Sequence, residues 1–316
     1  MEFELRDICE LLVSNYEAVR STDNDMDTEF VLAAAGIFTA ECMQADTELI
    51  NHAGYINKEK TCTLADYKSK NELFIRCKMA LSEDPEGYYD ELTDVCKQLQ
   101  TGKRFTEINN LISAIMLIDG IAPGGGGDYS EAAVNVKNRF IEMTGGSKGA
   151  DAEKPYAVVS ELFEADLDEL LKNEQTAKDF IKKRTKLDNV SQKGVARALS
   201  CYGGDIDEKC LRLCSVAEGL KKQKHSLGQG RFNVILALAI VLDISEEELV
   251  DHIIQAEEIL KQYKPFKGIM GVEPEVRRLF AIICAAIPLD STEGSFSRLL
   301  MMMSVYSIIM KNTRTF

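Results

Sequence analysis

Residues 232–242 read FNVILALAIVL, and this apolar block decides the fold of the chain. A helix without a polar face has to be covered on most sides. Similar blocks recur as FVLAAAGIF at residues 30–38 and LFAIICAAI at residues 279–287. Seven such helical blocks begin near Thr28, Asp66, Arg104, Lys154, Gln192, Arg231 and Pro274, at steps of 38, 38, 50, 38, 39 and 43 residues. A near-constant period of this size indicates an array of helical repeats.

The segments between these blocks are amphipathic. From Ser245 the chain reads SEEELVDHIIQAEEILKQY, in which Leu249, Ile253 and Leu260 share one stripe opposite the charged residues. Ser245 with Glu248 three residues later is a capping box, which predicts a helix start. Because alternating strand patterns are poor, we expect an all-α fold. The period predicts a superhelical array of antiparallel helix pairs, αα-hairpin repeats similar to armadillo or tetratricopeptide (TPR) arrays.

Two glycine-rich stretches interrupt the period. PGGGG at residues 123–127 and GGSKG at residues 145–149 flank a helical stretch near Tyr129 to Met143, inside the step of 50 residues. We therefore expect N-terminal repeats over 1–120, a glycine-rich central connection with one helix over 121–153, and C-terminal repeats over 154–316, within a single continuous array. Neither stretch has the phosphate-binding pattern GxxxxGK[ST] after a strand. GGSKG could hold an anion at the next helix start, but a flexible turn is the favoured interpretation.

Composition excludes some classes of partner. The net charge of −14 disfavours general binding to nucleic acid. The longest apolar run, Leu299 to Met310, is far shorter than the roughly 20 residues that a membrane span needs. The N-terminus MEFELRDICELL lacks the basic start of a signal peptide, so we expect a cytoplasmic protein. The nine cysteines are an odd number, and reduced thiols packed in the core are the favoured interpretation.

The last helical stretch, Phe296 to Met310, has little polar surface, although the terminal unit of an array normally has a polar outer face. Two alternatives follow. The stretch folds back onto the core of its own chain, or a second copy covers it in a homodimer.

Motifs for catalysis or metal binding are poorly supported by the sequence. There are three histidines and no HExxH, and the GxSxG match within GGSKG at residues 145–149 is interpreted as a turn, because no strand pattern precedes it as a nucleophile elbow requires. Cys201, Cys210, Cys214 and His225 lie close in sequence, but zinc sites usually contain C-x-x-C pairs, so core packing is favoured. We assign no catalytic residue, no metal ligand and no cofactor.

Basic residues recur near the starts of the apolar blocks. This ladder consists of Arg104, Lys154, Lys193, Arg197, Arg231 and Arg277, with Lys68, Lys70 and Arg278 beside it. A cation at a helix N-terminus gains nothing from the helix dipole. An uncompensated ladder along one edge would therefore bind an anionic partner, such as an acidic peptide or a carboxylate. The alternative, favoured in so acidic a chain, is that each cation pairs with a neighbouring Asp or Glu.

Several blocks taken together resemble a known family. GQG at residues 228–230 running into RFNVILALAIVL, EKPYAVVSELF from Glu153, and NELFIRCKMAL are similar to the bacterial domain-of-unknown-function family numbered four thousand and three. The resemblance covers roughly Thr28 to Ile287, and the insertion after Ile121 departs from it. It implies an all-helical bacterial cytoplasmic protein, and it gives no residue a role.

The leading hypothesis is a non-catalytic interaction or regulatory module that binds a peptide or anionic partner on a concave helical surface. The alternative is an all-helical enzyme, in which the superhelix closes into a toroid around a carboxylate-lined central cavity. A third hypothesis is a binder of a small apolar ligand, indicated by the methionine-rich last stretch alone.

Overall fold

The computed structural model describes residues 4–60, 71–101, 108–146, 151–268 and 271–312. Within these residues the chain forms fifteen α-helices, two short 3-10 segments and no strand. The predicted all-α class is confirmed. Three of the predicted block starts, Thr28, Lys154 and Pro274, are the first residues of helices, whereas Asp66 and Arg104 lie outside the described residues.

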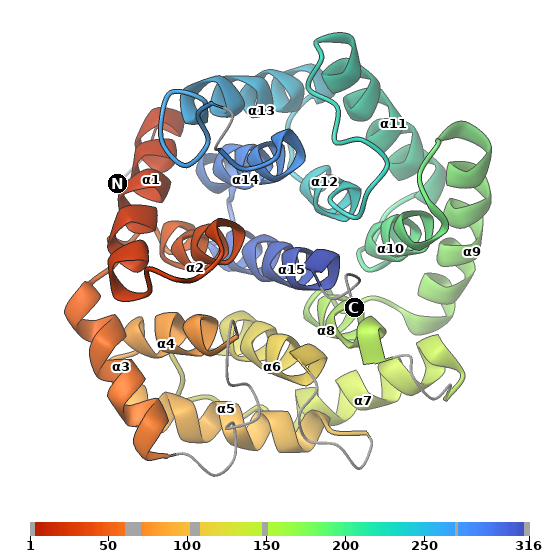
Figure 1. Cartoon of the computed structure of the whole chain (residues 1–316). Coiled ribbons are helices and arrows are strands. Elements are labelled where there is room, and N and C mark those ends of the chain that lie inside the picture. The colour runs from red at the N-terminus through yellow and green to blue at the C-terminus, as the bar shows by residue number, and fades with distance from the viewer. Residues whose placement is uncertain (1–3, 61–70, 102–107, 147–150, 269–270, 313–316) are drawn as a thin grey trace.

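The helices alternate between an outer and an inner layer around a ring (Figure 1). The outer helices are α1 (Leu5–Thr22), α3 (Thr47–Glu59), α5 (Pro85–Leu99), α7 (Ser130–Thr144), α9 (Leu167–Arg184), α11 (Ile206–Lys222) and α13 (Glu246–Leu260). The inner helices are α2 (Thr28–Ala40), α4 (Glu72–Ala80), α6 (Ile108–Ile121), α8 (Lys154–Leu162), α10 (Asn189–Ser200), α12 (Asn233–Ala239) and α14 (Pro274–Ala286). A last helix, α15 (Ser295–Asn312), lies in the middle of the ring.

The hydrophobic pattern of a helix agrees with its layer: inner helices are apolar on most sides, and outer helices have one apolar stripe. In α2 every residue from Phe30 to Ala40 is buried, as the absence of a polar face requires. In α13 one stripe is buried, including Leu249, Ile253 and Leu260. The Ser245 hydroxyl accepts a hydrogen bond from the Glu248 N–H at 3.1 Å, so the predicted N-cap of α13 is confirmed.

The ring closes where its first helix meets its last outer helix. α1 packs against both α13 and α14, and the Tyr263 hydroxyl donates to Glu10 Oε1 at 3.0 Å across this junction. The amphipathic N-terminal segment thus covers apolar surface that would otherwise face solvent at the end of an open array. Antiparallel pairs are present, but the superhelical repeat arrangement expected from the period is not confirmed, because the pairs meet in a ring.

Helix α15 fills the centre of the ring. It packs against α2, α6, α8, α12 and α14, and its residues from Leu299 to Ile309 are buried. Its end at Lys311 pairs with Glu29 at the start of α2, whereas its start at Arg298 pairs with Glu41 after the end of α2. The apolar stretch is therefore buried within its own chain, and the homodimer alternative loses its motivation.

The glycine-rich connection between α6 and α7 is held against the ring. The Gly126 N–H donates to Glu91 Oε1 at 2.7 Å, and the Ser82 hydroxyl donates to the Gly124 carbonyl at 2.6 Å. Because α7 takes a regular outer position, the longer step of the sequence adds loop and not a change of architecture. Of the second stretch, Ser147 to Gly149 lie outside the described residues.

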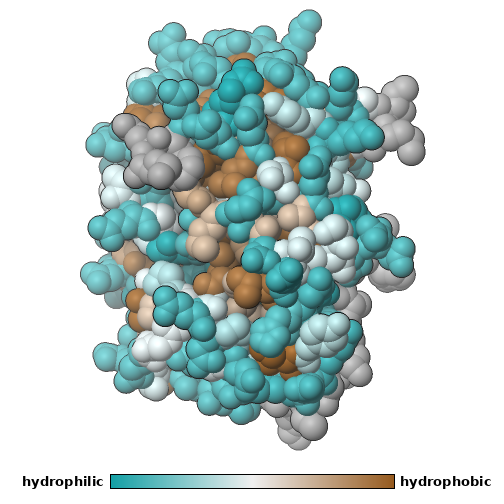
Figure 2. Space-filling view, turned by 90° about the vertical axis from the view of Figure 1, so that its left-hand side faces the viewer, coloured by the Kyte–Doolittle hydropathy of each residue, from teal (hydrophilic) through white to brown (hydrophobic). Residues whose placement is uncertain are grey.

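Figure 2 shows the side of the ring on which α1 and α3 lie. Polar side chains dominate this face, with apolar ones showing between them, and Leu49 and Tyr55 of α3 are among the exposed large apolar residues. Among the helices of the described ranges, none combines the length and apolar character needed to cross a membrane.

Candidate functional site

The described residues of the basic ladder lie in or just before inner helices, and two of them, Lys154 and Arg197, are buried. Lys154 is 2 % exposed and donates to Asn110 Oδ1 at 2.6 Å. Lys193 and Arg197 meet at one carboxylate, since both pair with Glu153, and Arg197 Nε also donates to Glu174 Oε2 at 2.9 Å. These cations are compensated by acceptors of the chain itself.

The remaining ladder residues differ from one another. Arg277 Nε donates to Glu257 Oε1 at 3.0 Å. Arg231 lies near the Tyr306 hydroxyl of α15, and its buried Nε has no hydrogen-bond partner among the described residues. Arg104, like Lys68 and Lys70, lies outside the described residues. Lys193 and Arg197 converge on Glu153, and the other described ladder residues do not converge with them on one anion site.

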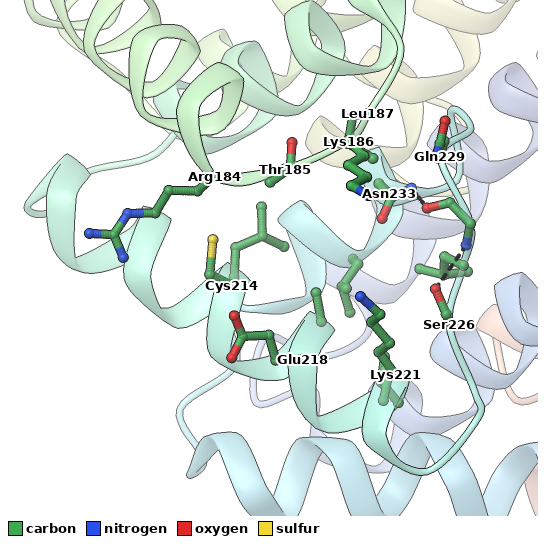
Figure 3. A pocket seen from close by; sticks show the side chains of 16 residues that line it. Arg184, Thr185, Lys186, Leu187, Cys214, Glu218, Lys221, Ser226, Gln229 and Asn233 are labelled. Carbon is green, nitrogen blue, oxygen red and sulfur yellow. Dashed lines mark hydrogen bonds between the residues drawn. The ribbon is translucent and has the colours of Figure 1, made fainter.

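A cavity of about 380 Å³ lies elsewhere, between the α9–α10 turn, helix α11 and the α11–α12 loop (Figure 3). Its apolar wall is made of leucines from the α9–α10 turn, α11, the α11–α12 loop and α12. Of these, Leu213, Leu220, Leu227 and Leu236 are buried, and Leu187 is partly buried. Polar side chains surround them: Arg184, Thr185, Lys186, Glu218, Lys221 and Gln229.

Two lysines face this cavity from opposite walls. In Figure 3 the side chains of Lys186, from the α9–α10 turn, and Lys221, from α11, both extend toward the space between them. Both side chains are exposed to solvent, and neither has a hydrogen bond or an ion pair with any described residue. Arg184 is different, because its guanidinium turns away and lies 4.9 Å over the Phe180 ring. The cavity therefore carries two uncompensated ammonium groups over an apolar wall.

The α11–α12 loop that forms one wall is fixed from both sides. The Asp188 N–H of the α9–α10 turn donates to the Gln229 carbonyl at 3.4 Å. On the other side, Arg278 of α14 donates to the carbonyls of Lys224 and Ser226. Asn233 Nδ2, at the start of α12, bonds the Gly230 carbonyl at 2.8 Å. These hydrogen bonds fix the loop wall of the cavity within the protein itself, without a ligand.

Arg278 is itself held by a buried carboxylate. Glu257 on α13 is 0 % exposed, and its Oε2 lies 3.3 Å from Arg278 Nε and 2.6 Å from His225 Nδ1. Burial disfavours the charged form, but hydrogen bonds from His225 and Arg277 outweigh it, so the pKa of Glu257 lies below its ordinary value. The carboxylate therefore stays charged and keeps Arg278 in position to bond the carbonyls of the α11–α12 loop.

The cysteine cluster seen in the sequence does not form a ligand set. Burial raises the pKa of Cys201 and of Cys210 to about 12, which keeps both as neutral thiols. Cys214 lies at the edge of the cavity. Within the part of the chain that the structure describes, no group of three or more His, Cys, Asp or Glu side chains could hold a metal ion.

Sequence reasoning missed Lys186 and Lys221. Lys221 belongs to the last turn of α11, and Lys186 follows the basic last turn of α9. Cations in this position are usually explained by the helix dipole. Both lysines lie where an outer helix passes into the next inner helix, Lys186 after α9 and Lys221 at the end of α11. Because these equivalent turns belong to neighbouring helix pairs, aligning the repeats could have identified the two lysines.

The comparisons with known proteins give no match: no protein-family model, no curated protein and no solved structure is similar to the chain. The resemblance to the domain-of-unknown-function family therefore stays untested.

Proposed function

We propose that the protein is a non-catalytic binding module whose partner presents an anionic group and an apolar portion to the cavity beside α11. The single observation that carries this proposal is the pair of uncompensated lysines, Lys186 and Lys221, over a leucine wall. The volume of about 380 Å³ lies in the range of small-molecule sites, about 300–1,000 Å³.

Charge supports the choice of an anion. The chain as a whole has a net charge of −14, whereas this cavity carries two ammonium groups without an ion pair. The local charge is therefore opposite in sign to the net charge of the chain. Glu218 is the acidic residue among those lining the cavity, and Lys186, Lys221 and Arg184 outnumber it. A carboxylate or phosphate between the lysines gains charge-assisted hydrogen bonds, while its apolar portion displaces water from the leucines. A small carboxylate and an acidic peptide share this chemistry.

A concave surface is the other part of the sequence hypothesis. In the ring, α15 occupies the inner side of the helix pairs, and its side chains from Leu299 to Ile309 are buried. We therefore place the binding surface at the rim, where the turns between outer and inner helices meet. The same helix lies where the enzyme hypothesis expects a central carboxylate-lined cavity.

The proposal includes a reducing, cytoplasmic location. What supports it is that the cysteines among the described residues are unpaired thiols, most of them buried.

Equilibrium titration with the linear monocarboxylates butyrate, hexanoate and octanoate tests the proposal. We expect saturable binding that strengthens with chain length, because each added methylene contributes about 0.8 kcal/mol when buried. Replacing both cavity lysines, Lys186→Glu with Lys221→Glu, is expected to weaken binding at least tenfold. The matched control is Lys183→Glu with Lys222→Glu, which makes the same charge change at neighbouring exposed positions that do not line the cavity.

The control should retain the affinity of the natural chain. Equal losses in both double variants would mean that net charge and not the cavity governs binding. Absence of saturable binding to any of the three acids, together with none to their phosphate-bearing counterparts, would remove the proposal.

A further inference from the structure

A second and smaller cavity, of about 100 Å³, lies where the inner helices α2, α4 and α6 end. Three charged side chains line it. Lys78 Nζ lies 2.7 Å from Asp119 Oδ2 and 3.6 Å from Glu41 Oε1. The side chains of Lys78 and Asp119 are each 4 % exposed, so this ion pair is almost completely removed from water.

Acceptors outnumber donors around this cavity. Among the residues that line it, two carboxylates, Glu41 and Asp119, share one ammonium. Arg298 approaches Glu41 on its other oxygen, Oε2, at 3.2 Å, and is not among the lining residues. With Arg298 counted, the two cations balance the two carboxylates in charge. What the cavity offers to a ligand is therefore the hydrogen-bond acceptors of Glu41 and Asp119.

An independent observation points to a ligand at this cavity. The Tyr88 side chain of α5 lines the cavity and is 2 % exposed, and its hydroxyl has no hydrogen-bond partner in the described protein. A buried hydroxyl without a partner is costly, so native proteins rarely keep one. Burial also raises the pKa of Asp119, although the neighbouring Lys78 acts to lower it.

We propose that this cavity binds a small cation with N–H donors, the ammonium ion or methylammonium. Its N–H groups donate to the Tyr88 hydroxyl oxygen and to the carboxylates of Asp119 and Glu41. The volume of the cavity, about 100 Å³, equals that of roughly three water molecules at about 30 Å³ each. A cation with one or two heavy atoms therefore fits into it. The site is separate from the cavity beside α11 and does not depend on the function proposed for it.

Calorimetric titration with methylammonium chloride, against potassium chloride and tetramethylammonium chloride at equal ionic strength, tests the proposal. We expect saturable binding of methylammonium and of ammonium, with potassium and tetramethylammonium binding at least tenfold more weakly. Potassium cannot donate hydrogen bonds, and tetramethylammonium has no N–H group.

Tyr88→Phe is the decisive variant. It removes only a hydroxyl that has no partner in the described protein, so the fold should be retained and thermal stability should not fall. Methylammonium affinity is nevertheless expected to drop at least fivefold. Tyr55→Phe, on the exposed face of α3, is the control and should bind as the natural chain does. Asp119→Asn, which keeps the shape and removes the charge, should abolish binding.

Three results would overturn the assignment: no saturable binding of ammonium or methylammonium, equal affinity for potassium, or unchanged affinity in Tyr88→Phe. The first would mean that the cavity holds water only.

Discussion

The side chain of Glu257 is fully buried on α13, and four basic side chains surround it: His225, Lys261, Arg277 and Arg278. Such a carboxylate is tolerated only because its partners and hydrogen bonds offset the cost of removing it from water. Two of these partners, Arg277 and Arg278, stood out in the sequence as basic residues at a helix start. Their partner did not, because Glu257 is one of several acids on an ordinary amphipathic helix.

We expect Glu257→Gln to lower the free energy of unfolding by about 3 kcal/mol, since removal of one member of a buried ion pair leaves its partners uncompensated. Glu258→Gln is the matched control on the next residue. Glu258 is 54 % exposed and pairs with Lys261, so its loss should cost about 1 kcal/mol or less. Urea unfolding followed by circular dichroism measures both, and equal effects would contradict the assignment of Glu257 as a buried hub.

The same variant should differ in its response to acid. The pKa of Glu257 lies below its ordinary value of 4.5 in the folded protein, because hydrogen bonds from His225 and Arg277 outweigh burial. The unfolded chain therefore takes up the proton first as the pH falls. This part of the stability is complete well above pH 4.5 and is lost as the pH falls through the folded-state pKa. The difference between natural chain and Glu257→Gln should thus shrink with decreasing pH.

At the scale of elements, the existence of the helices was predictable and the place of α15 was not. The block LFAIICAAI and the cap at Ser245 predict α14 and α13 because burial and capping are local properties. The stretch around Met301 to Met303 predicts only a helix that something must cover. Which surface covers it depends on the ring, which no local pattern contains. Contact with α2 is close, since a Cβ at Gly36 would come 2.4 Å from Met301 Sδ.

Methionine oxidation tests the position of α15 in solution. We expect brief treatment of the folded protein with hydrogen peroxide to convert Met43, which is 50 % exposed, well before Met301, Met302 and Met303, which are at most 1 % exposed. Peptide mass spectrometry measures the four sites in one sample. In urea the difference should disappear, which serves as the control. Equal rates in the native protein would mean that α15 leaves the centre of the ring.

At the scale of the whole molecule, the period of the sequence determined the pairing of helices but not the closure of the ring. The step between blocks is the same in an open array and in a closed one. Closure depends on the small rotation of each pair relative to the last and on the two ends meeting. Here they meet because α1 packs against α13 and α14, with the buried Cys9 thiol donating to the Ala256 carbonyl of α13 at 4.0 Å. The candidate cavity escaped prediction for a similar reason, since its lysines belong to adjacent turns of the assembled ring.

Hydrogen exchange distinguishes the two architectures. In an open array the terminal helices open most easily, because each unit has stabilising neighbours on both sides except at the ends. In the closed ring α1 has neighbours on both sides, α3 on one and α13 with α14 on the other. We therefore expect the central amides of α1, from Cys9 to Val19, to exchange as slowly as those of α11 on the far side. Protection in α1 that is weaker by several orders of magnitude would show that the junction with α13 and α14 is open in solution.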